Sequence, residues 1–271
     1  MVSGSSPAEA AAPEAAVSLM KLIKDPASLP FEQAGEGLAA ISSDRLTHHA
    51  LLQAFSLQLA WQPELTGDQF RLSKKPLRPA SVMIALIESL THQGQLDLLL
   101  TRRSSTLREH SGQIAFPGGR VDESDQDDTS AALREAFEEI GLLPDNVRVL
   151  GHLSRYVTGT GFDIAPVVGI VEGSYEPVLS EAEVSEVFRV PLQFLMNPAN
   201  HRRHRIEIAP TETTPGGQRS FYSMPYEVNS GSYFIWGATA AMLRNFYRML
   251  QAADQHPLAK YSGESSSGSS R

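Results

Sequence analysis

The chain has no cysteine among its 271 residues. This absence excludes disulfide bonds, thiolate metal sites and cysteine nucleophiles. No apolar run approaches the roughly 18 residues of a membrane-spanning helix, so we expect no membrane partner. Basic residues are the minority: 23 Lys and Arg against 31 Asp and Glu give a net charge of −8. A surface of this sign argues against a nucleic-acid partner.

The two ends of the chain have low sequence complexity. Residues 1–16 are rich in Ala, Ser, Pro and Glu and predict a disordered N-terminus, and residues 253–271 predict a flexible tail. Residues 17–77 carry interrupted helical patterns and predict a helical extension. The N-terminus lacks the basic start and apolar core of a signal peptide, which favours a cytoplasmic location. The final Ser-Ser-Arg suggests a peroxisomal location as the alternative.

Between these ends, residues 78–252 predict one folded domain with α/β or α+β character. His92–Gln95 separates two apolar runs and predicts a hairpin turn. We expect helices over 128–140, 191–197 and 237–252. The expected strands cover 82–87, 96–101, 147–153, 164–172, 185–190, 219–224 and 233–236.

Eight acidic residues lie within positions 122–139, and three of them have helical spacing. At about 100° per residue, Glu135, Glu138 and Glu139 share one side of a helix. Like charges at this spacing repel, and a hard divalent cation with oxygen ligands would offset that cost. The alternative is a solvated acidic helix. The opposite side predicts a buried apolar face, formed by Leu133, Ala136, Phe137 and Ile140.

The residues around this helix favour the metal interpretation. A Gly118-Gly119 turn precedes the helix, and glycines allow a backbone to approach a metal ion or a phosphate closely. A simple β-turn is the alternative. Asp128 or Thr129 is expected to cap the start of the helix, and Gly141 its end. Arg134 directly precedes the first of the three glutamates and can orient a glutamate carboxylate, so we expect it to have a supporting role.

Gly119 and the run from Arg134 to Leu142, REAFEEIGL, resemble the signature of the Nudix hydrolases, the Nudix box. The second half of that signature matches at every fixed position. The first half departs from it: the spacing is one residue longer, and Asp125 stands where the family has a glutamate. The resemblance implies an α/β fold of the Nudix type, an α/β/α sandwich with a mixed sheet. It also implies Mg²⁺ or Mn²⁺ as the cofactor.

The preceding segment, LLTRRSSTLREHSGQIAFPGG from Leu99 to Gly119, resembles the coenzyme A pyrophosphatase branch of this family. That resemblance implies a metal-dependent hydrolase that cleaves coenzyme A or acyl-coenzyme A. The products would be 4′-phosphopantetheine, or its acyl form, and adenosine 3′,5′-bisphosphate. The alternatives are a Nudix hydrolase of another nucleoside diphosphate derivative, such as ADP-ribose or a dinucleotide, and a non-catalytic nucleotide-binding module.

Candidate site residues follow from these two motifs. The catalytic candidates are Glu135, Glu138 and Glu139, which are also the candidate metal ligands, and the supporting Arg134. Cationic side chains just before the glycine turn could bind the phosphates of a small-molecule substrate, with a solvated loop as the alternative. The substrate-binding candidates are Arg102, Arg103, Arg108, His110, Phe116, Gly118 and Gly119.

Two other groups of charged residues lie further along the chain, and we expect both to lie on the surface. The basic run His201–Arg205 predicts an exposed loop, with contact to the substrate's 3′-phosphate end as the alternative. The downstream carboxylates Glu181, Glu183 and Glu186 predict a surface loop, and one of them could instead serve as a base or metal ligand. Trp236 and Phe234 are expected in the core. The sequence leaves the oligomeric state and the acyl-chain preference open.

Overall fold

The computed structural model describes residues 23, 25–65, 76–105, 112–210, 216–229 and 231–256. Two substrate-binding candidates, Arg108 and His110, lie outside the described residues. The helices are η1 (Pro26–Ser28), η2 (Ser43–Leu46), α2 (His48–Ser56), α3 (Asp128–Ile140), η4 (Pro144–Asn146), α4 (Leu192–Leu195), η5 (Pro198–Asn200) and α5 (Gly237–Gln255). The strands are β1 (Phe31–Gln33), β2 (Arg78–Glu88), β3 (Leu96–Arg103), β4 (Ile114–Ala115), β5 (Gly118–Arg120), β6 (Val147–His152), β7 (Tyr156–Val157), β8 (Phe162–Val171), β9 (Val184–Pro191), β10 (Arg202–Ile208), β11 (Gly217–Val228) and β12 (Gly231–Trp236).

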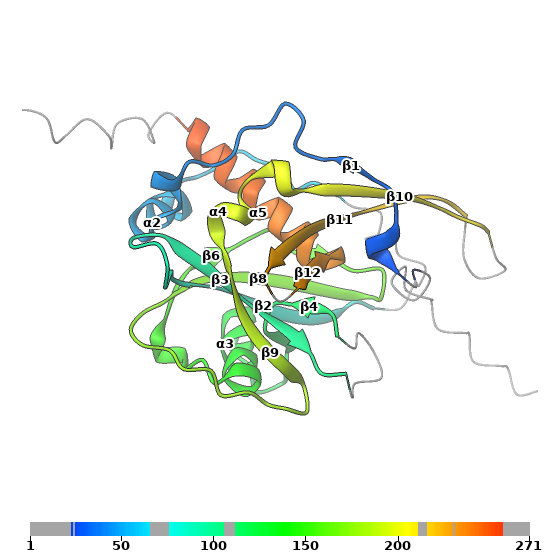
Figure 1. Cartoon of the computed structure of the whole chain (residues 1–271). Coiled ribbons are helices and arrows are strands. Elements are labelled where there is room, and N and C mark those ends of the chain that lie inside the picture. Colours follow the sequence, from blue (N-terminus) through cyan, green and yellow to red (C-terminus); the bar gives the residue numbers. More distant parts are fainter. Residues whose placement is uncertain are drawn as a thin grey trace, which may run out of the picture.

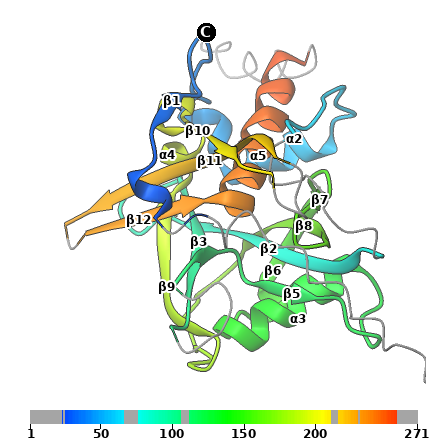
Figure 2. The ribbon, with the colours of Figure 1, turned by 90° about the vertical axis from the view of Figure 1, so that its right-hand side faces the viewer.

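An eight-stranded mixed sheet forms the centre of the fold. Its main path is β4-β3-β2-β8-β6, with β5 paired to β2, β7 to β8 and β9 to β3. The β2 and β8 strands run parallel, whereas β3 and β5 are antiparallel to β2. Helix α3 covers one face, and α5 and α2 lie on the other (Figures 1 and 2). The expected α/β/α sandwich with a mixed sheet is therefore confirmed.

Residues 82–87 of β2 are all apolar, because both faces of this part of the strand are covered. Met83 and Ala85 point into the smaller core cluster, where α3 packs. Ile84 and Leu86 point into the larger cluster, which α5 completes. The sheet thus lies between the two core clusters. Along β2, alternate side chains point into one cluster or the other.

The predicted turn at His92–Gln95 is confirmed, because β2 and β3 are antiparallel and the Gln95 N–H donates to the His92 carbonyl at 3.1 Å. The bounds of α3 also agree with the expected helix 128–140. The prediction of Asp128 or Thr129 as the cap was wrong by one or two residues, since the N-cap is Asp127. Its carboxylate accepts from the Ser130 N–H, and Ser130 returns the contact in a capping box. Gly141 ends the helix with φ of 70°.

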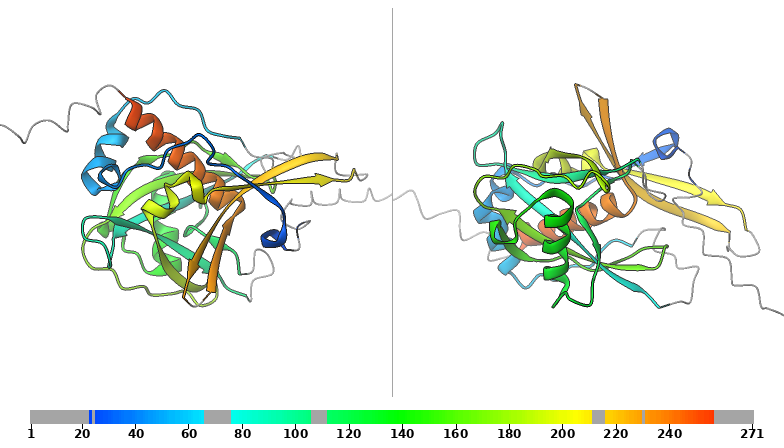
Figure 3. Two further views of the ribbon diagram at one scale, coloured as in Figure 1. Left: turned by 45° about the horizontal axis from the view of Figure 1, so that its top comes forward. Right: turned by 90° about the horizontal axis from the view of Figure 1, so that it is seen from below.

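A second, four-stranded sheet with the order β1-β10-β11-β12 was not predicted as a unit. Its β10–β11 hairpin extends beyond the rest of the molecule (Figures 1 and 3). The prediction of an exposed loop at His201–Arg205 was wrong, because residues 202–208 form β10. His201 and His204 are buried, and the His204 ring stacks on Phe221 with 4.6 Å between centroids.

The described part of residues 17–77 contains short helical elements and one strand. Strand β1 pairs with β10, and α2 contacts both β6 and α5. At the other end, α5 continues past residue 252 to Gln255. No helix within the described ranges is long and apolar enough to cross a membrane.

The environment of His201 predicts a pH-dependent stability. Its Nε2 contacts the Leu195 carbonyl at 2.7 Å, and its Nδ1 lies 3.1 Å from Nη1 of Arg244. Because an arginine nitrogen can only donate, Nδ1 must be the acceptor, and the ring is therefore neutral. Burial lowers the pKa of His201 to about 4. Below pH about 6.5 the unfolded chain binds this proton and the folded chain does not.

We therefore expect the free energy of unfolding to fall as the pH is lowered from about 6.5 to about 4, by roughly 1 kcal/mol per pH unit from this one group. Denaturant titrations at several pH values in this window measure the slope. A His201→Gln variant should be less stable at pH 7 but lack the His201 part of the slope. Identical slopes for the two proteins would contradict the prediction.

Candidate active site

Helix α3 holds its three glutamates at very different depths. The Glu138 side chain is 54% exposed, the Glu135 side chain is 15% exposed, and Glu139 is buried. The apolar face contains Ala132, Ala136 and Ile140, as the smaller core cluster shows. Phe137 was predicted on that buried face, but it is 48% exposed. The helix is thus rotated so that Glu139, rather than Phe137, enters the fold.

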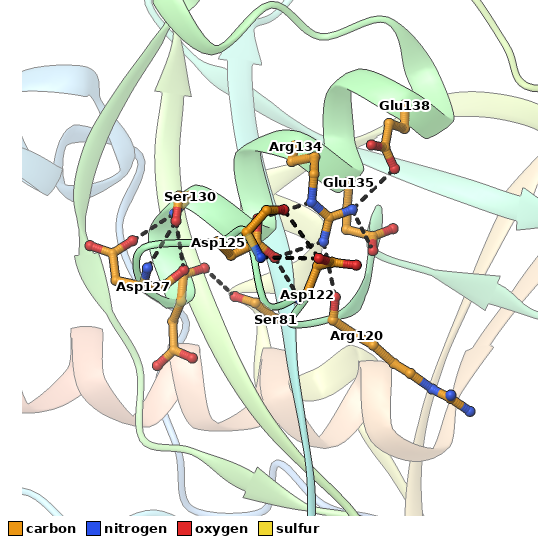
Figure 4. Close-up of polar contacts among 11 residues, drawn as sticks. Ser81, Arg120, Asp122, Asp125, Asp127, Ser130, Arg134, Glu135 and Glu138 are labelled. Carbon is orange, nitrogen blue, oxygen red and sulfur yellow. Dashed lines mark hydrogen bonds and ion pairs between the residues drawn. The ribbon is translucent and has the colours of Figure 1, made fainter.

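Arg134 connects the carboxylates of this region (Figure 4). It donates to both oxygens of Asp125, from Nε at 2.9 Å and from Nη2 at 2.8 Å. Its Nη1 donates to Glu135 at 3.0 Å and to Glu138 at 3.1 Å, and its Nη2 also reaches the Arg120 carbonyl at 3.0 Å. The expected supporting role of Arg134 rests on these contacts, which fix two glutamates and the loop before the helix.

Asp125 has a defined place in this network. Its side chain is 4% exposed, and hydrogen bonds from Arg134 hold the pKa of its carboxyl below the usual range. The Asp122 N–H also donates to Asp125 at 2.7 Å. The family signature has a glutamate at this point of the sequence. In this chain the longer loop brings the shorter aspartate to the arginine in bidentate geometry.

Glu139 contacts Gly118, and the prediction of a turn at Gly118-Gly119 was wrong, because both glycines lie in β5 and pair with β2. Its Oε2 accepts from the Gly118 N–H at 3.2 Å, and its Oε1 lies 3.6 Å from Nη1 of Arg103. Burial raises the pKa of Glu139 to about 7, and the negative charges of Glu135 and Glu183 act in the same direction. The Gly118 hydrogen bond and the Arg103 charge lower this pKa, and each has a smaller effect than burial. An additional positive charge at this point would therefore stabilise the ionised carboxylate.

Gly119 leaves room for Glu135. A Cβ atom at this position would lie 2.5 Å from Oε1 of Glu135, well inside van der Waals contact. Only the end of a flexible side chain is in the way, so an alanine would displace the carboxylate and leave the backbone in place. The absence of a side chain at Gly119 thus lets the carboxylate of Glu135, a candidate metal ligand, take its observed position.

We expect Gly119→Ala to lower kcat by about ten- to a hundredfold, because small displacements of a reacting group have effects of this size. Stability should change by less than about 0.5 kcal/mol, as for most substitutions that disturb no core contact. Steady-state kinetics and denaturant unfolding of the same preparation test both parts. Wild-type turnover would show that the position of Glu135 is not critical.

No group of three or more His, Asp or Glu side chains is already arranged around a common point in the described ranges. The negative charge of Glu135 nevertheless raises the pKa of Glu139, and the charge of Glu183 raises the pKa of both. Glu183 lies just before β9, which pairs with β3 beside the site. Among the downstream carboxylates, Glu183 is therefore the one whose charge reaches the glutamates of α3.

A pocket of about 310 Å³ lies on the opposite side of β5 from α3. The backbone of Gly118 and Gly119 contributes to both the pocket and the carboxylate site, so only this strand separates the two. The pocket is lined by Ala80, Val82, Arg103, Gln113, Ile114, Ala115, Phe116, Gly118, Gly119, Arg120, Thr158, Gly159, Thr160, Phe162, Ile164, Trp236, Ala238, Thr239 and Met242. Most of these side chains are apolar, and the cations are Arg103 and Arg120.

Some of the substrate-binding candidates line the pocket, and Arg102 does not. Arg103, Phe116, Gly118 and Gly119 line the pocket. Arg102 instead forms a 3.0 Å ion pair with Glu186 and packs over the Tyr233 ring at 5.2 Å. Successive residues of β3 point to opposite faces, which separates the two arginines. The expectation of a surface loop at Glu186 was wrong, because this residue lies in β9.

The sequence predicted only four of the 19 pocket-lining residues as substrate-binding, and four of the others bear on the shape and charge of the pocket. Arg120 and Phe162 lie on β5 and β8, and Thr239 and Met242 lie on α5. None of the four has a local sequence signal: the expected strands include neither Arg120 nor Phe162, and the expected helix 237–252 does not show which of its residues face a pocket. Trp236 is buried, as expected of a core residue, but it also forms part of the pocket wall.

Comparison with known proteins places these features in a family. Residues 77–211 match the NUDIX domain. The chain is 36% identical over 204 residues to the uncharacterized Nudix hydrolase NudL of Citrobacter koseri, covering 75% of this chain and 95% of that protein. It is 32% identical over 252 residues to Nudix hydrolase 22, chloroplastic, of Arabidopsis thaliana, covering 90% and 76%. Among solved structures, the MutT protein from Methanosarcina mazei Go1 aligns with a TM-score of 0.38 at 20% identity, over 67% of this chain and 96% of that chain. The domain match and the identity to NudL over nearly its full length show that the chain belongs to the Nudix hydrolase family.

Proposed function

We propose that the chain hydrolyses the pyrophosphate bond of coenzyme A or acyl-coenzyme A in a reaction that needs Mg²⁺ or Mn²⁺. The products are 4′-phosphopantetheine, or its acyl form, and adenosine 3′,5′-bisphosphate. Membership of the Nudix hydrolases supports action on a nucleoside diphosphate derivative. The segment Leu99–Gly119 supports coenzyme A within that class, through its resemblance to the coenzyme A pyrophosphatase branch.

The observation that carries the proposed chemistry is the buried carboxylate of Glu139 beside Gly118 and Arg103. Such a group is costly to ionise unless a cation compensates for the lost hydration. Glu139 and Glu135 are the proposed principal ligands, with Glu138 as the third carboxylate. Mg²⁺ and Mn²⁺ favour oxygen ligands and suit such a set. A bound divalent ion neutralises phosphate charge and lowers the pKa of bound water.

The remaining residues position the substrate and stabilise charge. Arg103 lines the pocket within ion-pair distance of Glu139, so its guanidinium can contact a phosphate held beside that carboxylate. Arg134 keeps Glu135 and Glu138 in place through its fixed contact with Asp125. Pyrophosphate hydrolysis depends mainly on such positioning and electrostatic stabilisation. The mostly apolar pocket offers space for an organic group attached to the phosphates.

A substrate panel tests this proposal. The full chain is assayed with Mg²⁺, with Mn²⁺ and with a chelator, on coenzyme A, acetyl-coenzyme A, ADP-ribose and a dinucleotide. We expect metal-dependent turnover with the highest kcat/KM on coenzyme A or its acyl form. A higher kcat/KM on ADP-ribose or the dinucleotide would assign the enzyme to another substrate. Binding without turnover of any compound would indicate a nucleotide-binding module.

A further inference from the structure

The pocket face of the central sheet carries two arginines around one aromatic ring. Strand pairing places Arg78 beside Phe162 and Arg120 beside Ala80. Side chains two residues apart on a strand share a face, and directly paired residues do as well. Arg78, Arg120 and Phe162 therefore lie on the same face as Ala80, opposite the face that packs against α3. Figure 4 shows the Arg120 side chain extending away from the carboxylates around Arg134.

Both guanidinium groups lie near the Phe162 ring. The Cζ atom of Arg78 is 3.9 Å from the ring centroid, and the Cζ atom of Arg120 is 5.8 Å from it. Arg78 also donates to the Thr160 carbonyl at 2.9 Å, which fixes its direction. These contacts hold two like charges close to one side chain, an arrangement that an anion between or beside them would stabilise.

Neither guanidinium has a carboxylate partner in the part of the chain that the structure describes. The nearest acidic residue in sequence to the ring, Asp163, is held by Arg155 at 2.9 Å. Other arginines near the site are paired, Arg134 with Asp125 and Arg103 with Glu139. Arg120 is thus the pocket-lining cation whose charge no described carboxylate neutralises.

The position of Arg120 separates it from the carboxylate site. Gly118 donates its N–H to Glu139, and Arg120 lies two residues further along β5, about 7 Å away along the strand. One strand therefore presents a site for a pyrophosphate at one end and an unneutralised cation at the other. A ligand that spans both must carry a second anionic group separated from its pyrophosphate by a unit of about the size of a ribose.

We propose that Arg120, supported by Arg78, binds a phosphate monoester of the substrate that is distinct from the scissile pyrophosphate. This inference rests on the proposed function, because it assumes that the pyrophosphate lies near Gly118. Charge-assisted hydrogen bonds from an arginine give such a contact both strength and direction. The contact makes Arg120 a specificity-determining residue: it favours nucleotides with a further phosphate on the ribose over those without one.

Binding of two small ligands tests the contact without catalysis. Isothermal titration with Mg²⁺ gives the Kd of the full chain for adenosine 3′,5′-bisphosphate and for 5′-AMP, which differ only in the second phosphate. We expect the wild type to bind the bisphosphate about tenfold more tightly than 5′-AMP. This ratio lies between the values typical of a buried charged hydrogen bond and of a solvent-exposed ion pair. Arg120→Ala should abolish this preference, and Arg120→Lys should retain part of it.

Two further variants make the comparison specific. Arg103→Ala should weaken the binding of both ligands but keep their ratio, because Arg103 lies at the Glu139 end. Arg148→Ala is the matched control: this exposed arginine pairs with Ile170, eight residues along β8 from Phe162, or about 26 Å along the strand. It should match the wild type on both ligands.

The outcomes separate this inference from the proposed function. A wild-type chain with equal affinity for the two ligands, or an Arg120→Ala variant that keeps the preference, would overturn the inference. Turnover of coenzyme A by the same preparations is measured in parallel. If coenzyme A is not hydrolysed but the preference depends on Arg120, the contact stands and the proposed reaction is rejected. If it is hydrolysed but the preference does not depend on Arg120, the reaction stands and the contact is rejected.

Discussion

Glu139→Gln is expected to lower kcat by about a hundredfold or more while the fold remains intact. The amide has nearly the same shape as the carboxylate, and its oxygen can still accept from the Gly118 N–H. It lacks the negative charge that a divalent ion requires. Since the native carboxylate is buried, a neutral replacement should not reduce stability. The measurement is kcat at saturating coenzyme A and saturating Mg²⁺, together with the free energy of unfolding.

Glu123→Gln is the matched control, because it removes one negative charge from the exposed loop before the same helix. It should keep wild-type turnover. Binding of Mn²⁺, followed by electron paramagnetic resonance, should weaken in Glu139→Gln and stay unchanged in Glu123→Gln. Near-normal turnover and unchanged Mn²⁺ affinity for Glu139→Gln would show that Glu139 is not a principal ligand.

Arg134→Ala should reduce both stability and activity. It leaves the shielded carboxylate of Asp125 without its bidentate partner and removes the donor that fixes Glu135 and Glu138. Loss of hydrogen bonds to a charged group of this kind costs about 2 kcal/mol. We expect a similar decrease in the free energy of unfolding, and a fall in kcat of about tenfold or more, because the displaced carboxylates no longer hold the reacting groups in place.

A double-mutant cycle with Asp125→Asn isolates the pair. If Asp125 is the principal partner, the double variant should be destabilised by less than the sum of the single variants, because the unpaired charge is absent. Arg148→Ala, an exposed arginine with a 3.8 Å ion pair to Glu172, is the control for loss of a surface guanidinium. Additive effects of the two substitutions would show that the Arg134–Asp125 contact contributes nothing to stability.

The acidic helix shows what local sequence could and could not predict. Its bounds followed from periodicity and from a glycine that can adopt positive φ, both of which depend on neighbouring residues. The orientation of the helix did not follow. A helical projection places Phe137 opposite the glutamates, but the depth of Glu139 depends on Gly118 of β5 and Arg103 of β3, which lie far away in the sequence.

The same limit applies to the pocket. The apolar runs predicted strands at 82–87 and 164–172, but not that residues 118–120 would form a strand beside β2 and bring Arg120 near Phe162. The basic run at His201–Arg205 was misread for a related reason. His204 is buried against Phe221 and Ser223 of β11, and His201 against the Leu195 carbonyl and Arg244 of α5. Pairings between distant strands are decided by the whole sheet and have no local signal.

The most direct test of the proposed function is product analysis after incubation of the full chain with coenzyme A. Chromatography and mass spectrometry should detect 4′-phosphopantetheine and adenosine 3′,5′-bisphosphate in equal amounts with Mg²⁺, and neither with a chelator. This result would place cleavage at the pyrophosphate and show that it depends on the metal. Intact coenzyme A, under conditions in which the same preparation hydrolyses another nucleoside diphosphate derivative, would contradict the proposal.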